Sequence, residues 1–161
     1  MTTPEQLAAA SKVWMYQSSR PLSPEEQQRI NVEMQAFARQ WTAHNQQLKA
    51  WGGVLEDRVL VLMVDETVAG ASGCSIDKSV HFMQDLEAKF GIQLFDRMLL
   101  SFKNTDGNVE TIPAAAISEK IEAGALQPHT PVINMLAASK AEIDTRFFIP
   151  FKDSWAGAMF L

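Results

Sequence analysis

The chain has 161 residues, a formal net charge of −5 and an isoelectric point near 5.2. This length allows one domain with a hydrophobic core, and an acidic balance provides no basic surface for nucleic acid or an anionic membrane. No apolar run approaches the roughly 18 residues of a membrane-spanning helix, and the N-terminus lacks the pattern of a signal peptide. We therefore expect a single cytoplasmic domain over 1–161, without membrane insertion or a nucleic-acid partner.

A strand and a long helix are predicted first. Lys12–Gln17 is rich in aromatic residues, which is typical of a strand. Ser23 and Glu26 then form a capping box around Pro24, a favourable first helical residue. Behind this cap, residues 24–43 carry one apolar stripe at helical spacing. The stripe consists of Ile30, Met34, Phe37 and Trp41.

Two further strands are predicted next. Residues 48–56 alternate weakly between apolar and polar, and the Gly52-Gly53 pair indicates a bulge or a close approach of another backbone segment. Residues 56–58 are expected to form a turn. Residues 59–65 are almost wholly apolar, as expected of a central strand that is covered on at least one face.

A second helix and a fourth strand follow. Apolar side chains trace one face over 77–90, and Gly91 stands where a helix C-terminus favours a left-handed residue. Residues 94–103 are predicted to form another strand, in which Asp96 and Arg97 make local ion pairs or hydrogen bonds.

This order of elements is typical of a ferredoxin-like fold. Strand, helix, strand, strand, helix and strand form the split β-α-β arrangement. Because crossovers are right-handed, the first two strands are predicted to be parallel, with the third between them and antiparallel to both. The sequence thus predicts an α+β protein with a ferredoxin-like β-α-β-β-α-β core over about 12–104.

A C-terminal α/β extension is predicted over about 105–161. Residues 104–108 carry a hairpin-turn signal followed by a short return strand. A third helix is predicted over 113–124, and two more strands over 130–136 and 143–151. We expect this extension to pack on the first sheet or to extend it, with a small separate subdomain as the alternative.

Four segments of the chain resemble a family of uncharacterised bacterial proteins that are often labelled "ABC transporter ATPase". These segments are AHNQQLKA, VDETVAGASGCSIDKSVHF, FGIQLFDR and DSW. The resemblance covers about residues 12–156 and implies no settled activity. A P-loop ATPase needs G-x-x-x-x-G-K-[ST] to hold phosphates, and residues 70–75 have neither this glycine spacing nor its lysine. We therefore expect no ATP hydrolysis.

Cys74 is the only cysteine and the first candidate catalytic residue. A thiol near a helix N-terminus is favoured as thiolate, whereas the alternative interpretation is a small buried residue in a tight loop. The predicted topology places His44, in the loop after the first helix, at the same sheet edge as Cys74. Because a Cys–His pair is the minimum for an activated nucleophile, a thiol-dependent enzyme or redox sensor is one alternative function.

Binding of an anion or nucleotide without hydrolysis at residues 70–77 is a third alternative. Ser75 and Asp77 compete as the N-cap of the second helix, whose free N–H groups favour anions. The candidate ligand-binding residues are Gly73, Ser75, Asp77, His81 and Arg20. No two of the three histidines and the cysteine share the short spacing of a metal site, so neither a metal nor a cofactor is expected.

Trp51 lies on a glycine-containing strand that the predicted topology places at a sheet edge. An apolar edge strand needs cover, which either the C-terminal segment 151–161 or a second subunit could provide. We expect a homodimer. Taken together, the sequence predicts a small non-catalytic binding or interaction module without a cofactor.

Overall fold

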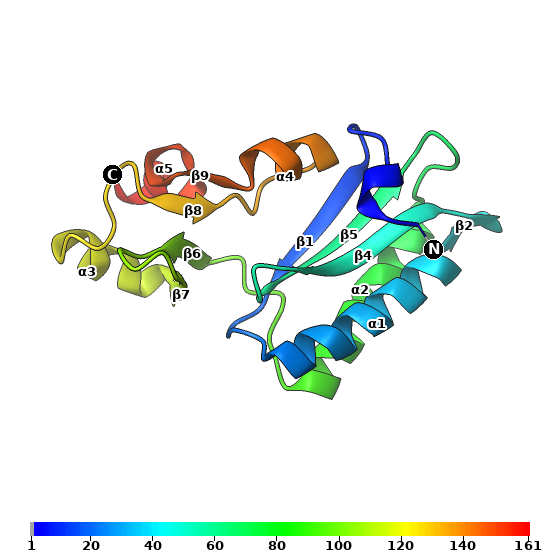
Figure 1. Ribbon diagram of the computed structural model, residues 1–161, viewed down its shortest axis with the longest axis horizontal. Coiled ribbons are helices and arrows are strands. Elements are labelled where there is room, and N and C mark those ends of the chain that lie inside the picture. Colours follow the sequence, from blue (N-terminus) through cyan, green and yellow to red (C-terminus); the bar gives the residue numbers. More distant parts are fainter. Residues whose placement is uncertain (1) are drawn as a thin grey trace.

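The computed structural model describes residues 2–161 and contains two main sheets next to each other (Figure 1). The first sheet has the order β1-β5-β4 and is formed by β1 (Lys12–Gln17), β4 (Lys49–Leu55) and β5 (Val59–Asp65). Helices α1 (Pro24–Gln40) and α2 (Gly73–Phe90) cover one face of it (Figure 1).

The second sheet and its helices come from the C-terminal part of the chain. The strand order is β7-β6-β8-β9. The strands are β6 (Leu99–Lys103), β7 (Val109–Pro113), β8 (Pro131–Ile133) and β9 (Phe148–Pro150). The remaining helices are α3 (Ile117–Glu122), α4 (Lys140–Arg146) and α5 (Trp155–Phe160). A small hairpin, β2 (Thr42–Ala43) and β3 (Gln46–Gln47), follows α1.

The sequence signals at α1 are confirmed in atomic detail. The Ser23 hydroxyl accepts a hydrogen bond from the Glu26 amide at 3.1 Å, and the Glu26 carboxylate accepts one from the Ser23 amide at 3.0 Å. Ile30 and Met34 from the predicted stripe are fully buried. The helix ends at Gln40 rather than at residue 43, because the chain turns there into the β2–β3 hairpin.

The predicted order of the first three strands is also confirmed. β5 pairs with β1 and with β4, antiparallel to both, so β1 and β4 are parallel. The register runs through Gly52 without a bulge. A Cβ on residue 52 would lie 3.1 Å from the Met34 carbonyl oxygen, so the glycine permits α1 to approach β4 closely.

The predicted fourth strand does not join this sheet. In a ferredoxin-like fold it would pair beside β1, but β6 pairs with β7 and β8 in the second sheet instead. Of the predicted strand over residues 94–103, only Leu99–Lys103 forms a β-strand. Leu94 is buried in the first core, and the Asp96 carboxylate accepts the Met98 amide in a turn, which directs the chain away from β1. The α+β class is confirmed, whereas the ferredoxin-like strand order is not completed.

The C-terminal extension differs from its predicted elements in two places. The predicted helix over 113–124 is a 3₁₀ turn followed by α3. Residues 143–146 of the predicted 143–151 strand belong to α4, because Ser139 caps a helix by accepting the Glu142 amide at 3.3 Å, and Phe148–Pro150 forms the strand β9. The predicted hairpin at 104–108 is present between β6 and β7.

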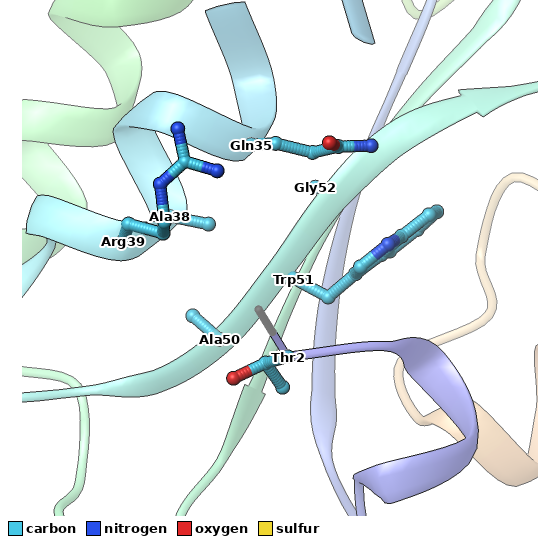
Figure 2. A pocket seen from close by; sticks show the side chains of 7 residues that line it. All are labelled: Thr2, Gln35, Ala38, Arg39, Ala50, Trp51 and Gly52. Atoms are coloured by element: carbon cyan, nitrogen blue, oxygen red, sulfur yellow. The ribbon is translucent and has the colours of Figure 1, made fainter. Parts of the chain in front are cut away.

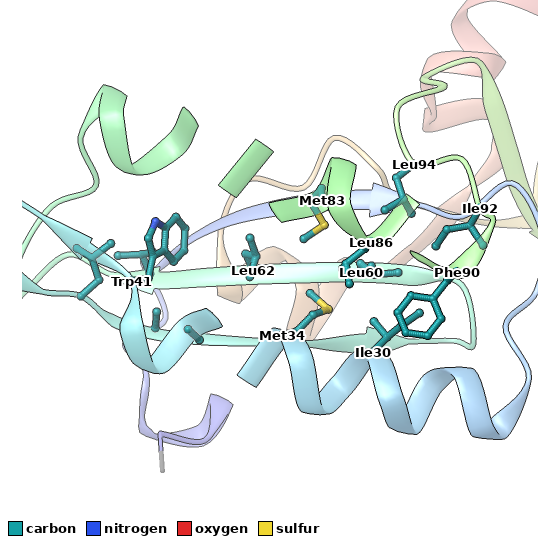
Figure 3. Packing of buried hydrophobic residues seen from close by; sticks show 14 of the residues in the cluster. Ile30, Met34, Trp41, Leu60, Leu62, Met83, Leu86, Phe90, Ile92 and Leu94 are labelled. Atoms are coloured by element: carbon teal, nitrogen blue, oxygen red, sulfur yellow. The ribbon is translucent and has the colours of Figure 1, made fainter. Parts of the chain in front are cut away.

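Three hydrophobic clusters hold these layers together. The first lies between the β1-β5-β4 sheet and the two long helices, where Met34, Leu62 and Met83 meet (Figure 3). The second is the core of the C-terminal part and includes Phe102 and Phe151. The third joins the opposite face of the first sheet to the C-terminal part. The extension therefore builds its own sheet and core and packs on the first sheet. None of the helices in residues 2–161 is long and apolar enough to cross a membrane.

α1 packs along β4 and satisfies part of its edge. The Asn31 side-chain oxygen accepts the Val54 amide at 2.9 Å, which satisfies an edge N–H that β5 does not reach. Residues 151–161, the segment predicted as a candidate cover, pack instead into the C-terminal core, so that alternative is wrong. An uncovered β4 edge was the reason to expect a homodimer. The homodimer itself stays a prediction.

Candidate functional site

Cys74 lies in the first turn of α2 and is exposed. The helix begins at Gly73, four residues earlier than predicted, because Ser72 is the N-cap and its hydroxyl accepts the Ser75 amide at 3.2 Å. Neither Ser75 nor Asp77 is therefore the N-cap. Since the thiol is exposed, the interpretation of Cys74 as a small buried residue is also wrong.

The loop after α1 does reach the start of α2, as the topology predicted. The Trp41 indole N–H donates to the Ser75 carbonyl at 2.8 Å. His44 is exposed at the turn of the β2–β3 hairpin, with φ of 50°. Within residues 2–161, no hydrogen bond joins its imidazole to the Cys74 thiol, so the structure brings the two segments together without assembling a nucleophile and its base.

We expect Cys74 to be accessible to alkylation in the folded protein. Iodoacetamide should label it in the folded protein without denaturant, because α2 leaves the side chain open to solvent. The variant His44→Ala should react at the wild-type rate, within about twofold, because thiolate reactivity follows local charge and access. Labelling rates measured by mass spectrometry against pH test this. A large fall in the labelling rate of His44→Ala would instead support the hypothesis that His44 activates Cys74.

The candidate ligand-binding residues do not converge. Gly73, Asp77 and His81 are exposed along the first turns of α2. Arg20 lies at the opposite end of this helix, where its guanidinium donates to the Phe90 carbonyl at 3.0 Å and to both Glu26 carboxylate oxygens. Within residues 2–161, no three histidine, cysteine, aspartate or glutamate side chains are grouped to hold a metal.

The two carboxylates with strongly lowered pKa values are structural. Hydrogen bonds from Arg20 lower the pKa of Glu26 to about 2. Hydrogen bonds from the Thr67 hydroxyl and from the amides of Ala8 and Thr67 lower the pKa of buried Asp65 to about 2. Asp65 thus ties the N-terminal segment and the loop after β5 to the end of that strand. Neither group is free to transfer a proton to a ligand.

One small cavity lies at the edge of β4, between α1 and the N-terminal segment (Figure 2). It measures about 10 Å³, which is comparable to the space for a single water molecule. The residues around it are Thr2, Gln35, Ala38, Arg39, Ala50, Trp51 and Gly52. This cavity is too small for a ligand.

A much larger groove of about 440 Å³ lies beside β1. Its volume falls within the range of ligand sites in proteins, roughly 300–1,000 Å³. Three segments and one further side chain line it. They are β1 residues 13–17, residues 94–99 before β6, residues 135–137 before α4, and Trp155. The groove occupies the position beside β1 that a fourth strand of the sheet would take.

Exposed apolar side chains gather at this groove. Of the seven large apolar side chains exposed within residues 2–161, three line it. Phe95 is 41% exposed, Met98 45% and Leu136 71%. Grouped exposed apolar side chains mark interaction surfaces, whereas single ones are ordinary. The groove is therefore the strongest candidate site in the molecule.

The charged groups of the groove are Asp96 and Arg97. The Asp96 carboxylate accepts a hydrogen bond from the Met98 amide at 2.9 Å, which is a local hydrogen bond of the predicted kind. Arg97 is exposed and has no ion-pair partner within residues 2–161. Tyr16 and Arg97 both line the groove. Burial raises the pKa of Tyr16, whereas a hydrogen bond with Ser79 and the positive charge of Arg97 act in the opposite direction.

Sequence reasoning missed this site. One signal was present: Phe95 and Met98 flank Asp96 and Arg97 in a segment where apolar and charged residues do not alternate as in a strand. No protein-family model, curated protein or solved structure matches the chain. The resemblance to the bacterial family labelled "ABC transporter ATPase" stays a prediction. Fold and site define an α+β protein with an apolar groove along an open strand edge.

Proposed function

We propose that the protein is a non-catalytic interaction module whose groove binds an apolar, acid-bearing segment of another protein. The groove beside β1 is the observation that carries this proposal. It combines about 440 Å³ of space with three exposed apolar side chains. The residues that could carry chemistry are dispersed: Cys74 and His44 share no hydrogen bond, and the Asp65 and Glu26 carboxylates are occupied by structural partners.

Charge complementarity supports an acidic group in the bound segment. Arg97 is the groove's one positive charge and has no ion-pair partner within residues 2–161. A guanidinium binds a carboxylate through paired N–H donors, so one aspartate or glutamate in the segment would satisfy it. Within residues 2–161, Asp96 forms no ion pair with Arg97, and its carboxylate accepts the Met98 amide instead.

The shape of the groove favours a slender segment over a second copy of the chain. Residues 94–99 and 135–137 line the same groove as β1. A second globular copy docking there would bring its own corresponding segments against them, whereas an extended chain fits between the two. We also propose a cytoplasmic location, because a single exposed thiol, Cys74, stays reduced most readily in that compartment.

Selection of phage-displayed random heptapeptides on the intact chain tests the proposed function. We expect enriched peptides to combine apolar residues with one aspartate or glutamate. Leu136→Asp should weaken their binding about tenfold or more, because burial of a leucine side chain is lost. Val32→Asp is the matched control, since Val32 is 62% exposed on α1 and lies outside the groove.

Two outcomes would contradict the proposal. One is that no peptide is enriched on the wild type relative to Leu136→Asp. The other is that analytical ultracentrifugation shows a stable dimer that Leu136→Asp dissociates and Val32→Asp does not, which would assign the groove to a second copy of the chain.

A further inference from the structure

We infer that the bound segment adds to the first sheet as a β-strand, hydrogen-bonded to the backbone of Met15 and Gln17. This inference rests on the proposed function and specifies how the groove holds its partner. β1 is an edge strand, and within residues 2–161 β5 is the one strand of the sheet that pairs with it. Edge strands present unpaired N–H and C=O groups that another chain can pair with.

The direction of the β1 backbone groups follows from bonds at its two ends. The Val13 amide donates to the Ala138 carbonyl at 3.2 Å, on the side away from β5. The Ser18 amide donates to the Arg58 carbonyl at 2.7 Å, toward the β5 side. Because these directions alternate along an antiparallel strand, Met15 and Gln17 face away from β5 as Val13 does.

These outward groups are free. Within residues 2–161, no hydrogen bond engages the backbone N–H or C=O of Met15 or Gln17 on the side away from β5. Both residues line the groove. Two donors and two acceptors therefore lie along this side of β1, spaced about 7 Å apart at roughly 3.3 Å per residue. Met15 is half-buried, whereas Gln17 is 4% exposed, so the bound segment reaches the Met15 groups first.

The chain itself shows that this edge accepts a strand. Ser139 forms an antiparallel bridge with Lys12, and the Lys140 amide donates to the Ser11 carbonyl at 2.9 Å. The pairing stops at Val13, because the Ala137 amide donates to the Asn134 carbonyl in a turn that leads the chain away from β1. A bound segment would continue the ladder at the residue where the protein's own pairing ends.

The groove has two apolar faces, and these determine which side chains the bound segment must carry. Tyr16 packs edge-on against Phe95 with 5.4 Å between ring centroids, and belongs to the face that α1 and α2 cover. Met15 and Met135 belong to the opposite face, which packs on the C-terminal part. Side chains of an added strand alternate between these two apolar faces, so consecutive residues of the segment would be apolar. Proline is excluded where the segment must donate to β1.

Amide hydrogen exchange measured by NMR tests the inference with the heptapeptide that binds best in the selection. On saturation, exchange at Met15 and Gln17 should slow at least tenfold. Trp14 and Tyr16 provide an internal reference, because their amides already pair with β5 and should change little. In a parallel series, one peptide amide at a time is N-methylated, and loss of binding should recur at every second position.

The outcomes separate this inference from the proposed function. If the peptide binds and Leu136→Asp weakens it, but Met15 and Gln17 exchange unchanged, the groove holds side chains only and strand addition is overturned. If N-methylation weakens binding without a period of two, strand addition is likewise overturned. If no peptide is enriched, the proposed function fails and the inference fails with it.

Discussion

Replacing Gly157 with alanine should destabilise the protein by on the order of 3 kcal/mol, although alanine is the better helix former. Gly157 lies within α5, so helix propensity alone would predict a gain. A Cβ at this position would overlap the Phe151 carbonyl oxygen and lie 2.8 Å from backbone carbons of Lys152. Backbone atoms cannot rotate away as a side chain can, so the clash outweighs the gain in propensity.

The neighbourhood of Gly157 leaves little room for relaxation. The Phe151 carbonyl accepts hydrogen bonds from the Ser154 amide at 3.1 Å and from the Ser154 hydroxyl at 2.7 Å. The Ser154 hydroxyl also accepts the Gly157 amide at 3.1 Å and so caps α5. The Phe151 side chain is completely buried in the C-terminal core. Moving this carbonyl would break the cap and shift that ring.

Thermal unfolding measures this effect. For a chain of this size, Gly157→Ala should lower Tm by about 6–12 °C. Gly73→Ala is the matched control, because Gly73 is also helical and a Cβ there meets nothing within 4 Å. It should leave the stability unchanged or raise it by up to about 1 kcal/mol. A Gly157→Ala protein as stable as the wild type would contradict the close approach of α5 to Phe151.

Local signals were sufficient for the first half of the fold. The Ser23 capping box and the stripe through Ile30 and Met34 predicted α1 because cap and periodicity are properties of neighbouring residues. The apolar run 59–65 predicted the central strand because only a strand covered by other elements is apolar throughout. Even the position of β5 between β1 and β4 followed from right-handed crossovers.

The fate of the fourth strand could not be predicted from local sequence. Residues 99–103 form a strand in either arrangement, and the choice between two sheets depends on long-range partners. β7, joined by a tight hairpin, and β8 offered β6 two neighbours in a second sheet. Once β6 pairs there, the β1 edge is left open and the groove forms. The site was missed because it results from this choice.

The predicted site residues do not form a common site, and the reason is related. Arg20 and Cys74 carry reactive or charged groups, but their roles depend on which groups reach them in the folded chain. Arg20 is occupied by Glu26 and the Phe90 carbonyl, 70 residues away in sequence. Residue type identified candidates for chemistry, whereas the strongest candidate site is made of backbone groups and apolar side chains that no motif marks.

Gln17→Leu should cost about 3 kcal/mol, because it breaks a buried hydrogen-bond chain between the two sheets. The Gln17 amide donates to the Leu99 carbonyl at 3.1 Å, and its carbonyl accepts the Ser101 hydroxyl. Ser101 and Thr111 hydroxyls are 2.7 Å apart, and Arg58 donates to Thr111 at 2.9 Å. Since Ser101 gives its one proton to Gln17, Thr111 must be the donor to Ser101.

Three of the four residues in this hydrogen-bond chain are buried and Thr111 is half-buried, so bulk water does not replace a partner lost at Gln17 or Ser101. Gln17 is 4% exposed, Ser101 1% and Arg58 4%. Leucine at residue 17 has a similar size but leaves the Leu99 carbonyl and the Ser101 hydroxyl without partners, at roughly 1–3 kcal/mol for each buried group. Gln84→Leu is the matched control: Gln84 is exposed on α2, and its replacement should change stability by no more than about 0.5 kcal/mol.

A double-mutant cycle with Ser101→Ala identifies the hydrogen bond as the cause. Removing the Ser101 hydroxyl from the Gln17→Leu protein eliminates one unpaired group, so the double variant should be more stable than the sum of the single effects by about 1 kcal/mol, measured by urea unfolding. If the effects of the two substitutions on stability simply add, the hydrogen bond between Gln17 and Ser101 is contradicted. Because Gln17 and Leu99 both line the groove, Gln17→Leu should also weaken heptapeptide binding while Gln84→Leu does not.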